Sequence, residues 1–385
     1  MGYCVLSAAM PPRVIPVRSS VDFNAFVDLP FELHAASPQW TPDLRSETVS
    51  LLTPGEHPFW ASARRELFLA LRQGRPVGRI AAIVDDKYNA YAGLACGAFG
   101  FFECEDDRET AHALLDAARD WLRGQGMTFM RGPLNPSTNY TCGLLVQGFH
   151  LPPTIMMPWN PTWYPELLES WHLRKEQDLL AYCIRREEFT PPEQLSAEVA
   201  RLKAEARFSC RVSGKDTLAE DIAIMLDLYR DSWAENWGFA PLSPGEAERL
   251  VRELSAVMDP EFFVLFFHGR EPAAGMVALP DMAPLLRKLK GRLGPTALWH
   301  WWRTRAQTRA GYRIILFGIR QEYRLLGLPL LLLDYLLEKA REHPRFQWVE
   351  GSWVLEDNVA VDELIEDFCG RLTKRYRIYR RDLES

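Results

Sequence analysis

The stretch YRIILFGIRQEYRLLGLPLLLLDYLLEKA, residues Tyr312 to Ala340, decides the fold because two kinds of element meet in it. Residues Tyr312–Ile319 are apolar, β-branched and aromatic, which predicts a buried strand. Further on, leucines surround a single polar stripe that includes Asp334 at helical spacing. We therefore expect a strand, a loop that contains Arg and Gly, and then a helix with Pro329 in its first turn.

The leucine run also raises the question of a membrane span. A spanning helix needs roughly 20 apolar residues, and the run from Leu325 to Leu337 is shorter and contains Gly327 and Asp334. We therefore predict a buried core helix. The N-terminus lacks the basic start and long apolar core of a signal peptide, so we expect none.

Composition limits the classes of protein that this chain can belong to. A length of 385 residues, with 47% apolar and 25% charged residues, is typical of a globular protein with two domains. The net charge of −6 argues against a general nucleic-acid binder. Seven cysteines without a Cys-x-x-Cys, and histidines without a His-x-x-x-His, predict neither a disulfide framework nor a metal site. We expect a cytoplasmic protein.

The loop between the strand and the helix has the features of a phosphate site. Free backbone N–H groups and the positive end of a helix dipole meet there, and Arg320 and Arg324 add positive charge. The alternative is a simple turn with Gly327 in the bend.

Residues Arg324-Leu325-Leu326-Gly327-Leu328-Pro329 resemble the Arg/Gln-x-x-Gly-x-Gly/Ala signature of the GNAT acyltransferases. The resemblance implies a mixed α/β (α+β) sheet and backbone amides that hold the pyrophosphate of acetyl-CoA or another acyl-CoA. Pro329 departs from the signature, because proline has no N–H to donate. The implied coenzyme-binding residues are Phe317, Gly318, Ile319, Arg320, Gln321, Arg324, Leu325, Leu326, Gly327, Leu328 and Asn358.

The same resemblance implies acyl transfer from the thioester to an amine. Candidate bases are Glu350 and Glu322, and Tyr376 and Tyr379 are candidate donors to the leaving thiolate. The tyrosine that the family often places seven residues after the asparagine is replaced by Ile365. Each glutamate has the alternative of a solvated carboxylate, and each tyrosine that of a packing residue. Residues expected to shape the acceptor pocket, unless they are only core aromatics, are Trp233, Asn236 and Trp237.

On both sides of this motif the sequence predicts further helices and strands, in the order that the GNAT resemblance implies. Ser243 and Glu246 form a capping box at the start of a helix. Residues Val359–Leu372 read as a later helix, and Gly318 is the expected position of a bulge in the strand before the loop.

The chain also repeats itself. Two predicted hairpins, with turns at Gln73–Pro76 and His268–Pro272, match each other, and Asn160 and Asn358 each precede a closing strand at the same spacing. This pattern predicts two tandem GNAT-like domains, 1–187 and 188–385, that divide near Glu187–Leu195. In the first copy, acidic residues near the helix start would repel phosphate, so we expect the coenzyme only in the second. These acidic residues are Glu103, Glu105, Asp106 and Asp107.

Three functions remain open at this point. The first is an acyltransferase that acts on the amine of a small molecule or peptide. The second is an aminoacyl-tRNA-dependent transferase of tandem GNAT type, which would need a basic surface, and the third is a non-catalytic acyl-CoA-binding scaffold. The sequence does not predict the oligomeric state.

Two further segments stay without a fixed role. The long loop at 132–158 is a candidate wall between the domains. The basic run Arg287–Pro295 reads as an anion site or a solvated face. Beside it, Trp299, Trp301 and Trp302 read as core residues or as a site for a flat or lipidic group.

Overall fold

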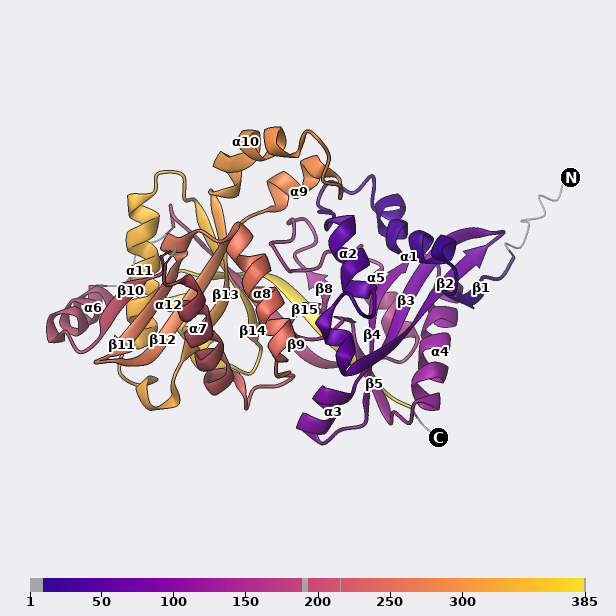
Figure 1. Cartoon of the computed structure of the whole chain (residues 1–385), viewed down its shortest axis with the longest axis horizontal. Helices are drawn as coiled ribbons and strands as arrows, with labels where there is room; N and C mark the ends of the chain where they lie inside the picture. Colours follow the sequence, from indigo (N-terminus) through magenta and orange to yellow (C-terminus); the bar gives the residue numbers. More distant parts are fainter. Residues whose placement is uncertain (1–9, 189–192, 215, 384–385) are drawn as a thin grey trace, which may run out of the picture.

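The computed structural model describes residues 10–188, 193–214 and 216–383 and consists of a large mixed sheet with helices on both faces (Figure 1). The elements of the first half are β1 (Arg13–Pro16), α1 (Ser20–Leu33), α2 (Arg45–Leu52), a 3-10 turn (Pro58–Ala61), β2 (Ala63–Arg72), β3 (Arg75–Asp85), α3 (Asp86–Ala92), β4 (Cys96–Cys104), α4 (Arg108–Gly124), β5 (Phe129–Gly132), β6 (Leu134–Asn135), β7 (Thr141–Cys142), β8 (Leu144–Gln147), α5 (Tyr164–Ser170) and β9 (Arg174–Arg185).

The second half repeats this order with insertions. Its elements are α6 (Glu193–Glu205), β10 (Ser209–Val212), α7 (Leu218–Trp233), α8 (Pro244–Val257), a 3-10 turn (Pro260–Phe262), β11 (Phe263–His268), β12 (Glu271–Pro280), α9 (Ala283–Leu289), α10 (Ala297–Thr308), β13 (Gly311–Ile319), a 3-10 turn (Gln321–Tyr323), α11 (Leu328–Glu342), β14 (Trp348–Leu355), α12 (Val359–Asp367) and β15 (Arg371–Asp382).

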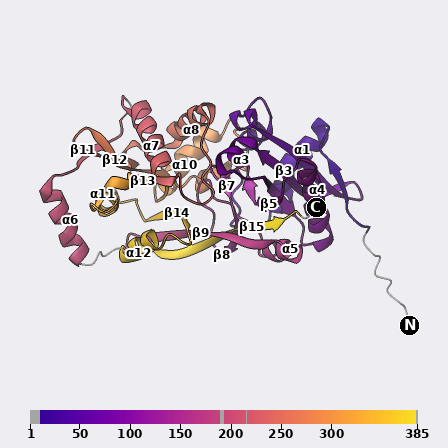
Figure 2. The ribbon, with the colours of Figure 1, turned by 90° about the horizontal axis from the view of Figure 1, so that it is seen from below.

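The closing strands of the two halves are exchanged. The sheet runs β1-β2-β3-β4-β5-β15-β9-β14-β13-β12-β11-β10, so β15 lies against β5 of the first half and β9 against β14 of the second. Strands β9 and β15 also pair with each other, antiparallel, and Figure 2 shows them side by side along the lower side of the molecule, where they link the two halves. Each half is therefore completed by a strand of the other.

The first half packs helices on both faces of its strands. Leu114, Ala118 and Leu122 of α4 are fully buried against one face, and Gly97 on β4 leaves room for Leu122 to approach. Phe26 of α1 is buried in a separate cluster that includes Leu67 of β2. Burial of each such Leu or Phe side chain stabilises the fold by about 1.5–3 kcal/mol.

The leucine run forms the core helix α11 and is not a membrane span. Leu328 and Leu332 are fully buried, and the helix packs with α6 over one face of the second half. Helices α7 and α8 cover the other face (Figure 2). Among the residues that the structure describes, no helix is both long and apolar enough to cross a bilayer.

Most predicted elements agree with the structure. The capping box of Ser243 and Glu246 is confirmed at the start of α8. The helix predicted over 359–372 is wrong at its end, because the chain leaves α12 through Cys369 with a left-handed φ of 62°. The Gly370 N–H then donates to the Ile365 carbonyl at 2.8 Å, which ends the helix.

The repeat is visible in matched positions of the two halves. Asn160 lies shortly before α5, and Asn358 is the N-cap of α12; each of these helices leads into a closing strand. The Pro-Pro break at 191–192 that marked the predicted boundary lies outside the described residues.

Candidate active site

The site starts where β13 and β14 separate. The two strands pair in parallel only from Gly311 opposite Trp348 to Ile314 opposite Gly351. On its other side β13 pairs with β12, and Ile315 is the extra residue of a bulge in that ladder. A matching irregularity in the β14–β9 ladder leaves Trp353 unpaired. These two irregularities bend the strands apart and open a gap in the sheet.

The predicted position of the bulge, Gly318, is wrong. Gly318 pairs regularly with Gly275 of β12. Its missing side chain instead lets α7 approach, because a Cβ there would lie 3.3 Å from the Leu228 carbonyl. The glycine therefore serves helix packing, and the bulge occurs at a β-branched residue.

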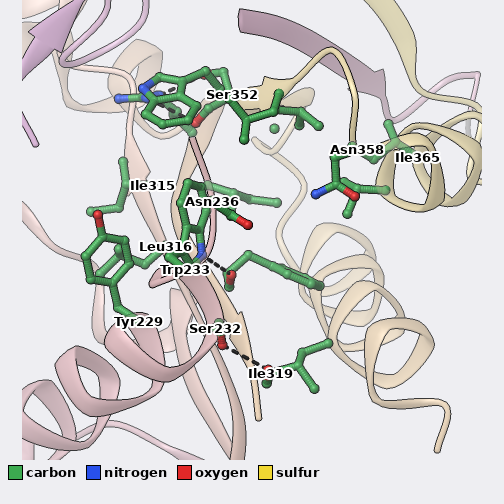
Figure 3. A pocket seen from close by; sticks show the side chains of 18 of the residues that line it. Tyr229, Ser232, Trp233, Asn236, Ile315, Leu316, Ile319, Ser352, Asn358 and Ile365 are labelled. Atoms are coloured by element: carbon green, nitrogen blue, oxygen red, sulfur yellow. Dashed lines mark hydrogen bonds between the residues drawn. The ribbon is translucent and has the colours of Figure 1, made fainter. Parts of the chain in front are cut away.

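A cavity of about 690 Å³ occupies the gap. Its lining includes Leu250 and Leu254 of α8 on one face of the sheet and Leu364 of α12 on the other, so it passes through the sheet. Figure 3 shows Tyr229 and Ile315 on one side of this space and Asn358 and Ile365 on the other. Other apolar residues of the lining are Ile184, Leu226, Leu242, Ile314, Leu316, Phe317, Leu333, Val349, Val354, Leu355 and Val361.

Side chains from α7 bind the free edge of β13. The Trp233 Nε1–H donates to the Phe317 carbonyl at 3.2 Å, and the Ser232 hydroxyl donates to the Ile319 carbonyl at 2.9 Å (Figure 3). Trp233 also packs edge-on against Trp353, with ring centroids 5.4 Å apart. The α7 helix thus holds the strand edge and walls the cavity at once.

The start of α11 meets the cavity at its rim. Gly327 is the N-cap with a φ of 81°, and no acidic residue lies in the first turn of the helix. Arg324, Leu325 and Pro329 line the cavity, and the Arg324 guanidinium donates to the Ser232 carbonyl at 3.1 Å. A cation and a helix N-terminus therefore face the same opening, which favours a bound phosphate.

A buried ionic network lies beside the cavity. The Glu350 carboxylate accepts hydrogen bonds from Lys374 at 2.6 Å, Thr154 at 2.7 Å and Ser352 at 2.9 Å. Arg313 donates to the Ser352 hydroxyl at 2.8 Å, and both Arg313 and Ser352 line the cavity. Burial acts to raise the pKa of Glu350, but Lys374 and these hydrogen bonds outweigh it and hold the pKa below its usual range.

The equivalent gap of the first half is filled by the chain itself. Strands β4 and β5 also pair briefly in parallel, from Cys96 opposite Phe129 to Ala98 opposite Arg131. Strand β6 then enters the gap, and its Asn135 side chain accepts a hydrogen bond from the Phe101 amide at 2.6 Å. The approach is so close that a Cβ at Gly100 would lie 1.8 Å from the Leu134 carbonyl oxygen.

The start of α4 in the first half is acidic. The Asp107 carboxylate accepts from the Thr110 amide at 2.8 Å and pairs with Arg72 at 2.7 Å, so it occupies the helix N-terminus. A smaller cavity of about 340 Å³ lies nearby and is lined by Glu105 and Asp106. The prediction that Glu103 faces the start of α4 is wrong.

Glu103 is held within the first half's core region instead. Its carboxylate contacts His34 at 2.7 Å and accepts from the Tyr164 hydroxyl at 2.8 Å. It is an acceptor in a buried network and takes no part in repelling a ligand at α4.

Two curated proteins match almost the whole chain. One is "Bacterial ceramide synthase" of Caulobacter vibrioides, 32% identical over 379 residues, which are 96% of this chain and 97% of that protein. The protein belongs to the family of this bacterial ceramide synthase. "Protein YghO" of Escherichia coli is 29% identical over 94% of this chain and 93% of its own length. No protein-family model matches the chain.

Solved structures show the fold of this ceramide synthase family member. A tandem GNAT protein from the clavulanic acid biosynthesis pathway matches with a TM-score of 0.56 and 13% identity over 97% of this chain and 99% of that one. A GCN5-related N-acetyltransferase from Sphaerobacter thermophilus matches with a TM-score of 0.53 and 12% identity, over 98% of both chains. The tandem GNAT fold is therefore confirmed.

The four predicted catalytic side chains of this family member do not meet in the cavity. Glu350 is buried in its ion pair with Lys374, and Glu322 is exposed on the 3-10 turn before α11. Neither Tyr376 nor Tyr379 belongs to the cavity lining. Their positions on β15 explain this, because that strand lies among first-half elements.

The two tyrosines have different surroundings. The Tyr379 hydroxyl donates to Glu169 at 2.9 Å within the first half's core. The Tyr376 hydroxyl is buried and has no hydrogen-bond partner among the described residues, and burial raises its pKa well above its usual value. Both hydroxyls are therefore neutral and neither belongs to the lining, although Tyr376 packs in one cluster with the lining residue Leu355.

The predicted coenzyme residues divide into two groups. Those that line the cavity are Phe317, Ile319, Arg324, Leu325 and Asn358. The others point elsewhere: Arg320 pairs with Asp227 at 2.7 Å, and a Cβ at Gly327 would meet Leu202 of α6 at 2.4 Å. The members outside the lining are Gly318, Arg320, Gln321, Leu326, Gly327 and Leu328.

The predicted acceptor residues Trp233, Asn236 and Trp237 all line the cavity. The sequence did not single out the contribution of the other half. Tyr182 and Ile184 of the exchanged strand β9 line the cavity, and so does the segment Thr138–Tyr140 from the long loop. The length of that loop was the signal that could have found part of this wall.

The long loop is tied to the second half by specific hydrogen bonds. The Asn139 amide donates to the Ala240 carbonyl at 2.7 Å and accepts from the Tyr229 hydroxyl at 3.1 Å. The Thr138 hydroxyl donates to the Gly238 carbonyl at 2.6 Å. The cavity therefore depends on both halves.

An acyl-CoA fits the residues at this site. Its phosphates match the start of α11 with Arg324, and an acyl chain matches the apolar gap. Tyr182 shares a small cluster with Ile365, the residue at the position where the family resemblance implies a tyrosine. Burial, and then Asp362, raise the pKa of Tyr182 to about 12, so its hydroxyl keeps its proton at neutral pH.

Proposed function

We propose that the protein transfers a long-chain acyl group from acyl-CoA to the amino group of a long-chain amine and so forms an amide of the ceramide type. The apolar lining of the cavity on both faces of the sheet carries this proposal. One apolar chain can occupy the α12 side and another the α7–α8 side. The relative in Caulobacter vibrioides, named a ceramide synthase, supports the same substrate class.

In this proposal the coenzyme lies across the rim with its phosphates at α11 and its thioester near the bulge at Ile315. The amine nitrogen attacks the thioester carbonyl carbon and forms the C–N bond as the C–S bond breaks. The thiolate leaves with the electron pair of that bond, and the amine loses one proton. The products are the amide and the free thiol of the coenzyme.

The amine must be neutral when it attacks, and the cavity promotes this. Apolar surroundings disfavour a charged ammonium and lower its pKa. Glu350 stays ionised in its pairing with Lys374, and we assign it the positioning of Ser352 and Arg313 at the cavity wall. We assign Tyr182 the delivery of a proton to the leaving thiolate, and the proton that the amine loses returns the Tyr182 phenolate to its neutral form, directly or through water.

Chain-length dependence tests this function. Purified protein is assayed with sphinganine and saturated acyl-CoAs of increasing length, and the amide is detected by mass spectrometry. Each added methylene buried in the cavity contributes about 0.8 kcal/mol, so kcat/KM should rise about fourfold per methylene until the cavity is full. Short amines such as ethanolamine are the matched controls.

Other outcomes would replace the proposal. Equal rates with acetyl-CoA and palmitoyl-CoA would indicate a small-group acetyltransferase. Binding of acyl-CoA without turnover on any amine would indicate a scaffold. Activity only with charged tRNA would indicate an aminoacyltransferase.

A further inference from the structure

The helical insertion between β12 and β13 has its apolar side on the outside. Helix α10 exposes Leu298 by 76% and Trp302 by 56%, and Trp299 and Trp301 by 52% and 48%. Its buried positions are the small polar residues Thr304 and Thr308. A helix of a soluble protein normally shows the reverse pattern. The core packing considered for these tryptophans from the sequence is wrong.

The same insertion is strongly basic. Residues 281–310 contain seven Lys and Arg and a single acidic residue, Asp281, although the whole chain has a net charge of −6. Two of the cations rest over exposed rings: Arg303 over Trp299 at 4.8 Å and Arg305 over Trp302 at 5.6 Å. The exposed cations are Lys288, Lys290, Arg292, Arg303, Arg305 and Arg309.

Helices α9 and α10 project from one edge of the molecule (Figure 1). The connection to the body is made through α9, where Arg287 donates to the Thr41 hydroxyl at 3.0 Å and Leu285 and Leu289 are buried. The outer surface of α10 is thereby held in a fixed position without being covered.

We propose that α10 and the loop before it form a docking surface for an anionic lipid bilayer. Tryptophans prefer the interface between lipid headgroups and acyl chains, and leucines enter the acyl region. The surrounding Lys and Arg meet the negative headgroups. A 12-residue helix lies flat in such an interface.

Two other occupants fit less well. A second copy that used the same face would bring the two sets of seven cations together, which costs electrostatic energy. RNA would satisfy the cations and could stack on the tryptophans, but Leu293 and Leu298, exposed by 65% and 76%, would gain nothing from it. The bilayer uses all three kinds of side chain.

Vesicle flotation of the full chain tests the surface. The protein is mixed with vesicles of phosphatidylcholine, with or without phosphatidylglycerol, and should float with the anionic vesicles and much less with the neutral ones. Each Lys or Arg near an anionic surface contributes a factor of about five, so Arg303→Ser with Arg305→Ser should weaken partitioning about thirtyfold. Trp301→Ser with Trp302→Ser should reduce flotation to the level of neutral vesicles.

The matched control is Arg341→Ser with Arg345→Ser, which removes two exposed cations elsewhere and should float like the parent. Equal loss in both arginine pairs, or no flotation of the parent, overturns the proposal. The proposal is also overturned if the parent binds tRNA and the variant Trp301→Ser with Trp302→Ser loses tRNA binding but still floats with anionic vesicles. The proposal does not rest on the acyl acceptor, because flotation is measured without substrate.

Discussion

The two halves of the molecule contain the same gap in the sheet and use it in opposite ways. Between β4 and β5 the gap is closed by β6, whose Leu134 carbonyl approaches Gly100 too closely for any side chain. Between β13 and β14 the gap holds a cavity of about 690 Å³. One copy of the fold has therefore become a packed support, and the other keeps the site.

The helices that follow the two gaps, α4 and α11, also differ in the charge at their N-termini. The start of α4 is occupied by the Asp107 carboxylate, whereas the start of α11 has Arg324 and no acidic residue in its first turn. The filled gap is thus followed by a helix whose N-terminus holds a carboxylate, and the open gap by a helix whose N-terminus has a cation beside it. We propose that acyl-CoA binding needs both features.

The largest expected effect concerns the buried charges beside the open gap. Lys374→Ala leaves the Glu350 carboxylate buried without its cation, which should lower the free energy of unfolding by about 3–5 kcal/mol. Urea unfolding measures this. Lys374→Met combined with Glu350→Leu should recover most of the loss, and a double variant as unstable as the single one would contradict the account.

The pH dependence of unfolding separates the charge effect from a loss of packing. The pKa of Glu350 is lowered from 4.5, so its contribution to stability is present above that pH and is lost as the pH falls through the folded value. The difference between parent and Lys374→Ala should therefore shrink below pH 4.5. A difference that stays constant with pH would point to packing alone.

The next effect tests whether the exchanged strand supplies a catalytic group to the open gap. Tyr182→Phe removes the hydroxyl and keeps the ring, so kcat should fall about 100-fold with KM nearly unchanged. Tyr335→Phe is the control, because its hydroxyl donates to the Glu261 carbonyl away from the cavity. An unchanged kcat in Tyr182→Phe would contradict the role of Tyr182 and would indicate that solvent protonates the leaving thiolate.

The smallest effect compares the two helix starts. Arg324→Ala removes an exposed cation at α11 and should weaken coenzyme A binding about tenfold, since the backbone amides remain. Arg75→Ala makes the same change beside α4, where Arg75 pairs with Glu105, and should leave binding unchanged. Isothermal titration checks both, and equal losses would mean that the two starts are not functionally distinct.

Local patterns predicted much of this molecule. Hairpins, the α8 capping box and the core helix α11 depend on neighbouring residues, so the sequence indicates them. The exchange of β9 and β15 could not be predicted in this way, because each strand pairs with partners far away in the sequence and local patterns carry no record of that pairing.

The site was predicted only in part for the same reason. Trp233 and Arg324 belong to the motif region and reach the cavity, whereas Tyr182 arrives from the other half. The bulge at Ile315 carries no glycine to mark it. Gly327 does adopt the left-handed conformation, but its open side faces Leu202, so Gly327→Val would press on α6 as well as on a ligand.

The most direct test of the account fills the open gap between β13 and β14 with a side chain, as β6 fills the gap between β4 and β5. A Cβ at Gly351 would meet its nearest neighbour, Ile365, at 3.8 Å, so a side chain there fits and points into the cavity. Coenzyme A is titrated into the parent, Gly351→Ala and Gly351→Phe by calorimetry. The account predicts one site per chain in the parent, nearly the same affinity in Gly351→Ala, and no binding in Gly351→Phe with unfolding unchanged. Two sites per chain, or full binding in Gly351→Phe, would contradict it.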